Sequence, residues 1–176
     1  KNGDIDIACD LAGEGIEEIK ADNNLVMSQE PGMGVNYIYF NMENGPTADI
    51  KVRKALQMAV DRDAMCAALY QYGECSPAYL PLPPASWGYD ESLEDLVPKY
   101  DVEGAKKLLA EAGYPEGFEL EYYTSDSASS KKIGEILQQF CAKVGVEVNI
   151  HQASWGTFSE IGASGNADAI GMSWTW

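Results

Sequence analysis

Residues 49 to 89 read DIKVRKALQMAVDRDAMCAALYQYGECSPAYLPLPPASWGY, and the rest of the chain is arranged around this stretch. Small and apolar side chains recur in its first part at the spacing of one helical face: Val52, Ala55, Leu56, Ala59 and Val60. Asp49 stands just before them, where its carboxylate can accept hydrogen bonds from the first turn. The pattern predicts a packed helix that begins after Asp49.

The second half of the stretch predicts another helix and then a stiff crossing segment. Asp61 or Asp63 can cap this helix, and Gly73 ends it because glycine readily takes the left-handed conformation that closes a helix. Prolines recur over residues 77 to 84, and each fixes its own φ and keeps its predecessor out of the helical region. Two short helices therefore lead into an extended segment.

Length and charge narrow the class of protein. A chain of 176 residues suits one domain with a single core. The sequence has 45% hydrophobic residues and no apolar run near the roughly 20 residues that span a bilayer, so no membrane anchor is expected. With 12 basic and 28 acidic residues the net charge is -16, which argues against nucleic acid and anionic membranes as partners.

The reactive side chains indicate neither a metal site nor an enzyme. Cys9, Cys66, Cys75 and Cys141 form no CxxC pair, and His151 is the single histidine, so we expect no metal and no cofactor. Cys66 and Cys75 are close enough to bridge, although buried free thiols are equally plausible. No hydrolase elbow, P-loop or HExxH motif is present, and His151 lies in an alternating strand, where a surface or hydrogen-bonded role is expected. We therefore expect no catalytic residues.

The remaining elements alternate between strands and helices. Period-2 alternation predicts strands over residues 4 to 9, 25 to 29, 35 to 42, 118 to 123 and 146 to 151. Helical spacing predicts helices over residues 14 to 21, 102 to 112, 133 to 144 and 155 to 161, the last capped by Ser154. The strands at 25 to 29 and 35 to 42 are expected to form a hairpin or a neighbouring pair, and those at 118 to 123 and 146 to 151 to be parallel neighbours. The class is α/β, a three-layer-like mixed sheet flanked by helices.

Two blocks of sequence resemble a known family. The first comprises Tyr39-Phe40-Asn41, Asp49, Val52 to Leu56, Ala59 to Arg62, Gly73 and Pro77-Ala78, and the second comprises Tyr100-Asp101, Ala105 to Leu109 and Ala112 to Pro115. In this order and spacing they resemble the extracytoplasmic solute-binding proteins of ABC importers, in the peptide/nickel class, family 5. The resemblance implies that residues 1–176 form a single lobe, the C-terminal lobe of a two-lobed type II periplasmic-binding-protein-like fold, cut at the hinge crossings.

The resemblance also implies a function. The intact protein would capture a peptide outside the membrane and deliver it to an ABC permease, as a periplasmic protein or a cell-surface lipoprotein. An oligosaccharide or a nickel or other metal complex is the alternative solute. The fragment is expected to be monomeric and, with half a cleft, to bind ligand weakly or not at all.

Aromatic side chains are the candidate ligand contacts, because rigid rings form apolar walls at low entropic cost. By resemblance, Trp155 faces the cleft and Trp174 lies beside the hinge strand; the further candidates are Trp176, Tyr39 and Asn41. A place in the core or in an interface is the alternative role for each of these side chains.

One departure from the family concerns charge. Peptide-binding members commonly carry an arginine after the strand at 118 to 123 or near the two tryptophans, but this chain has Thr124, Ser125, Gly162 and Gly171 there. A bidentate anchor for a ligand carboxylate is missing from these positions. A tight, free-ended dipeptide ligand is therefore disfavoured.

Overall fold

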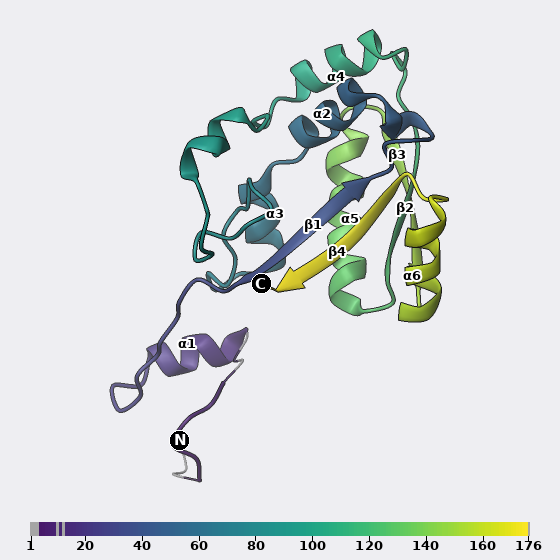
Figure 1. The fold of residues 1–176 in the computed structure, drawn as a ribbon. Helices are drawn as coiled ribbons and strands as arrows, with labels where there is room; N and C mark the ends of the chain where they lie inside the picture. The colour runs from purple at the N-terminus through teal and green to yellow at the C-terminus, as the bar shows by residue number, and fades with distance from the viewer. Residues whose placement is uncertain (1–3, 10, 12, 176) are drawn as a thin grey trace.

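A computed structural model describes residues 4–9, 11 and 13–175, and its ribbon is shown in Figure 1. Four strands form one sheet in the order β1-β4-β2-β3: β1 Gly34–Phe40, β2 Phe118–Ser125, β3 Val146–Ala153 and β4 Ala169–Thr175. β2 runs parallel to β3 and to β4, whereas β1 is antiparallel to β4. The mixed α/β sheet and the parallel pairing of β2 with β3 confirm two predictions.

Helices cover both faces of this sheet. The helices are α1 Glu14–Lys20, which lies apart from the sheet, and α2 Ile50–Ala59, α3 Arg62–Leu69, α4 Val102–Glu111, α5 Ala128–Ala142 and α6 Trp155–Ser164, with short 3-10 helices η1 Pro46–Ala48 and η2 Glu91–Leu96. Strand alternation divides the β2 side chains between the two faces. Leu120 and Tyr122 pack in the cluster that contains Leu137 of α5, while Tyr123 packs on Phe158 of α6. The main core thus lies on the α5 face.

Aspartates begin three of the helices, as expected. Asp49 accepts from the backbone N–H of Lys51 at 2.7 Å, and Asp61 from that of Ala64 at 3.0 Å. Asp101 does the same for α4. Each such cap stabilises its helix by about 1 kcal/mol.

The apolar stripe of the opening stretch is the centre of the core. Val52, Ala55 and Ala59 are fully buried, and they pack with Leu109 of α4 and Val148 of β3 in one cluster. Small side chains on this face let α2 approach α4 closely. The prediction of a packed helix after Asp49 is confirmed.

Two predicted strands are wrong. Residues 4 to 9 and 25 to 29 have no strand structure, and β1 pairs with β4 instead of forming a hairpin with residues 25 to 29. Ile7 and Val26 are 81% and 96% exposed. Alternation identifies a segment that can be a strand, but a strand also needs a neighbour to satisfy its backbone, and these segments have none within the described chain.

Smaller differences concern loops and caps. Residues 91 to 96, for which no helix was predicted, form η2, and α5 begins at Ala128, capped by Ser127, instead of at the predicted residue 133. Ser154 precedes α6 as predicted, but its hydroxyl bonds Thr157 instead of a backbone N–H. Among the residues described, no helix is long and apolar enough to cross a bilayer.

The cysteines fall into three environments. Cys66 and Cys75 form a disulfide, one of the two states that the sequence left open. Cys141 is a buried free thiol whose pKa burial raises to about 12, and Cys9 is an exposed thiol. A thiol with such a raised pKa is unreactive at neutral pH.

Candidate ligand-binding site

The carboxyl ends of three parallel strands meet at one edge of the sheet. β2 ends at Ser125, β3 at Ala153 and β4 at Thr175, and we call this the carboxyl edge. From that edge β2 leads into α5 on one face, whereas β3 leads into α6 on the other. Ligands of open α/β sheets bind where neighbouring connections diverge in this way.

β4 has an open flank at this edge. β1 pairs with it over seven positions, but β2 pairs with it only at Tyr122–Ala169 and Tyr123–Ile170. Within the described chain no strand pairs with β4 on the β2 side beyond Ile170. We call residues 171 to 173 on that side the open flank. Alternate residues of a strand direct their backbone groups to opposite sides, so this flank offers hydrogen-bonding groups to an extended chain.

A buried tyrosine lies where the pairing of β2 with β4 ends. Tyr122 is 1% exposed, and its hydroxyl covers the backbone of Gly171, where a Cβ atom would overlap it. On the other side its ring contacts Gly134 of α5. Burial raises the pKa of Tyr122, and a hydrogen bond from Thr124 partly offsets this. Two glycines thus make room for the tyrosine that packs beneath the start of the open flank.

The two leading tryptophan candidates lie at the carboxyl edge. Trp174 pairs with Val35 near the end of β4 and is 53% exposed. Trp155 opens α6 directly after β3, is 66% exposed, and has its ring 5.7 Å from that of Phe158. The structure brings both indoles to one edge, and their contact with a ligand stays a prediction.

Tyr39 and Asn41 lie at the opposite end of β4. Tyr39 pairs with Ile170, and burial, followed by the nearby Tyr37, raises its pKa. The Asn41 side-chain amide donates to the carbonyl of Gly165 at 2.8 Å, and its oxygen accepts two backbone N–H groups. The structure does not bring these two residues to the carboxyl edge. Trp176 lies outside the described residues.

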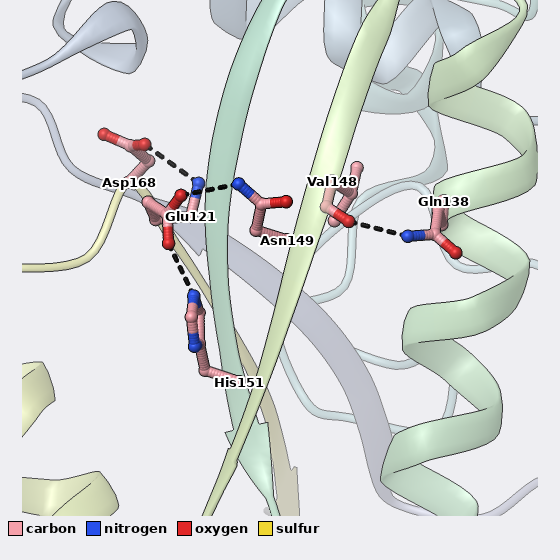
Figure 2. Close-up of polar contacts among 6 residues, drawn as sticks. All are labelled: Glu121, Gln138, Val148, Asn149, His151 and Asp168. Carbon is pink, nitrogen blue, oxygen red and sulfur yellow. Dashed lines mark hydrogen bonds and ion pairs between the residues drawn. The ribbon is translucent and has the colours of Figure 1, made fainter.

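A polar cluster on the α6 face was not identified from the sequence. Figure 2 shows Glu121 between three partners. Its carboxylate contacts Nε2 of His151 at 2.5 Å and accepts from Asn149 at 2.8 Å, while its backbone N–H donates to Asp168 at 3.0 Å. The hydrogen bonds from Asn149 and then His151 lower the pKa of Glu121. The contact with Glu121 confirms the predicted hydrogen-bonded role of His151. Its ring also stacks on that of Tyr123, with 4.6 Å between the ring centroids.

Serine hydroxyls occupy the place of the missing arginine. Ser125 and Ser130 hydrogen-bond at 2.7 Å, and Ser127 caps α5 through the N–H of Ser130. The two arginines of the chain are engaged elsewhere: Arg53 donates to the carbonyls of η1, and Arg62 lies over the Tyr79 ring. An arginine for a ligand carboxylate is therefore not available at this edge of the described structure.

Ligands for a metal ion do not gather in the part of the chain that the structure describes. No group of three or more histidine, cysteine, aspartate or glutamate side chains there is arranged to hold one.

The mixed sheet with helices on both faces places the fold in the type II periplasmic binding protein class. The chain belongs to the bacterial extracellular solute-binding proteins, family 5 Middle, whose pattern it matches over residues 1–176. This is a family of solute-binding proteins, and the membership confirms the resemblance seen in the sequence.

Three similar proteins illustrate the range of the family. The chain is 35% identical over 91% of its length to Heme-binding protein A of Haemophilus influenzae and 34% identical over 91% to the Dipeptide-binding protein of Escherichia coli. A solved structure of the ABC transporter-associated periplasmic binding protein DppA from Helicobacter pylori, in complex with the peptide STSA, matches 93% of the chain with a TM-score of 0.80 and 26% identity. The chain spans only 30% or 31% of the length of these three proteins.

Proposed function

We propose that this chain is the peptide-binding part of an ABC importer receptor and that the peptide lies extended along the open flank of β4. The observation that carries the proposal is the loss of β2–β4 pairing beyond Ile170, which leaves one side of β4 open at the carboxyl edge. An extended peptide adds to such an edge through main-chain hydrogen bonds, and pockets beside it select its side chains.

Aromatic side chains support the same ligand. Trp174 follows the open flank directly, and Trp155 stands at the start of α6 on the same edge. Indole rings form rigid walls that accept many side chains. The names of the similar proteins from Escherichia coli and Helicobacter pylori favour a peptide over an oligosaccharide or a metal complex.

The absence of an arginine narrows the choice of peptide. Main-chain hydrogen bonds along β4 do not depend on the ends of the peptide, whereas a free carboxylate at this edge would lack a bidentate partner. Peptides of four or more residues, or end-blocked peptides, are therefore the preferred ligands in this proposal.

The proposal extends to the whole protein. In this proposal residues 1–176 belong to the C-terminal lobe of a two-lobed receptor. The lobes close on the peptide and present it to the permease subunits. Residues 1–176 are monomeric in this proposal, and the receptor has no enzymatic activity and works in the periplasm or as a lipoprotein at the cell surface.

The test is a tryptophan-fluorescence titration of the complete two-lobed protein with a tetrapeptide pool, an oligosaccharide pool, a nickel complex and hemin as separate ligands. Hemin is included because one similar protein is named for heme. Saturation by the peptide pool alone supports the proposal. Saturation by any other ligand alone contradicts it, and tight binding by residues 1–176 alone contradicts the half-cleft interpretation.

Trp174→Ala and Trp87→Ala are the matched pair for this titration. Trp87 is 99% exposed in the loop before η2, so its removal controls for the loss of an exposed indole. Only Trp174→Ala is expected to weaken peptide binding, by about tenfold or more.

A further inference from the structure

The segment that precedes β1 has few contacts of its own with the lobe. Of the described residues before β1, Ile16 alone is buried, while Ile5, Ile7 and Val26 are exposed. Figure 1 shows α1 set apart from the sheet, beyond the end at which β1 begins. Burial of one side chain is a weak attachment for more than 20 residues, so other contacts must determine where this segment lies.

Those contacts converge on the loop closed by the disulfide. Cys66 and Cys75 are nine positions apart, so the bridge encloses the end of α3 and the turn at Gly73. We call residues 66 to 75 the disulfide loop. Gly73 has φ of 84°, and the loop turns back there toward α3.

Two hydrogen bonds join this loop to both sides of α1. Before α1, the backbone N–H of Gly13 donates to Glu74 at 3.4 Å; after α1, the side-chain amide of Gln29 donates to the carbonyl of Gly73 at 2.8 Å. Glu74 is itself oriented by the N–H of Tyr72, which donates to its second oxygen at 3.0 Å. Consecutive residues of one loop thus hold both ends of the α1 segment.

We infer that the disulfide loop is a clasp for the segment that leads into β1. The disulfide holds the loop in the conformation in which Glu74 and the carbonyl of Gly73 accept hydrogen bonds from Gly13 and Gln29. The buried residues of the main cluster lie outside the disulfide loop, and Met65, next to Cys66, packs against them. We therefore expect the core to persist without the bridge. Structural disulfides persist in oxidising compartments, so the clasp is closed outside the cytoplasm and open in a reducing one.

Trypsin cleavage tests this inference, because Lys20 lies in α1 and Lys107 lies in α4. The variant is Cys66→Ala/Cys75→Ala, which removes the bridge without adding thiols, and Cys9→Ala is the matched control. Cleavage rates after both lysines are followed by mass spectrometry of the 176-residue chain. The double variant is expected to speed cleavage at Lys20 by about tenfold, with no change at Lys107.

A second pair of variants separates the loop's hydrogen bonds from the bridge itself. Glu74→Ala removes the acceptor for Gly13 and is expected to speed cleavage at Lys20 by about threefold, whereas the exposed Glu160→Ala has no effect. Unchanged cleavage at Lys20 in the double-cysteine variant overturns the clasp. Equal acceleration at Lys20 and Lys107 also overturns it, because the disulfide would then stabilise the whole lobe. Neither outcome depends on the proposed ligand.

Discussion

The two ends of β4 differ in how they use their polar groups. At the amino end, the carbonyl of Asp168 accepts from Asn41 at 2.9 Å and from the buried Thr47 at 3.1 Å, and its carboxylate accepts from Glu121. At the carboxyl end, β2 no longer pairs with β4, and Trp174 is exposed. Polar groups that hydrogen-bond one another stabilise the fold, whereas the open flank beside the exposed Trp174 ring can bind a ligand. The difference separates structural residues from candidate binding residues on the same strand.

The largest expected effect is steric and lies where pairing of β2 with β4 ends. Gly171→Val places side-chain atoms on the Tyr122 hydroxyl, inside a packed core. Overpacking of this kind destabilises a protein by about 1–3 kcal/mol. Urea unfolding measures the change in unfolding free energy, and Gly156→Val, whose Cβ would meet no neighbour within 4 Å, is the control for the change of residue type. Equal losses in the two variants would show that the Tyr122 contact is unimportant.

At the amino end of β4, loss of the hydrogen-bond acceptor Asp168 should lower the unfolding free energy. Asp168→Ala leaves the N–H of Glu121 without its carboxylate partner. A lost acceptor of this kind costs about 1–2 kcal/mol of unfolding free energy. The measurement is again urea unfolding, with Asp126→Ala at an exposed position as the control. Peptide affinity should be unchanged in Asp168→Ala, and a large loss of affinity would contradict the division between the two ends.

Trp174→Ala should show the reverse behaviour. More than half of this side chain is exposed, so its removal is expected to change the unfolding free energy by less than about 1 kcal/mol while peptide affinity falls. Thermal unfolding and fluorescence titration of one preparation provide both values. If the variant lost stability but bound the peptide with normal affinity, Trp174 would have a structural role and not a ligand-binding one.

The smallest expected effect is a pH dependence. The lowered pKa of Glu121 means that its ionised form favours the folded state, so its contribution is complete above the ordinary glutamate pKa and is lost as pH falls through the lowered value. Glu121→Gln should therefore reduce the acid sensitivity of unfolding, while leaving the variant less stable than the parent at neutral pH. The contribution is small because the side chain is 40% exposed. Parallel pH profiles for the two proteins would contradict this assignment.

Local signals predicted the helices better than the sheet. The caps at Asp49 and Asp101 and the stripe from Val52 to Ala59 act within one or two turns, so a single sequence reveals them. The order of strands depends on contacts between distant segments, and alternation alone wrongly made strands of residues 4 to 9 and 25 to 29.

The site was only partly predictable for the same reason. Trp155 and Trp174 were singled out by resemblance, whereas the Glu121–His151 contact depends on the register of β2 against β3. Alternation along each strand could have placed Glu121 and His151 on the same face of the sheet. It could not have shown that these two residues face each other. The end of β2–β4 pairing at Ile170 and the close approach of Tyr122 to Gly171 are tertiary features with no local signature in the sequence.

The most direct test of the central claim is amide chemical-shift mapping of the 176-residue chain with an end-blocked tetrapeptide at millimolar concentration. We predict shifts at the amides of residues 171 to 173 and at the Trp174 indole, none at Asp168 or Glu121, and loss of these shifts when the peptide backbone is N-methylated. Shifts confined to the amino end of β4, or an identical response to the N-methylated peptide, would contradict the proposal that β4 receives an extended backbone.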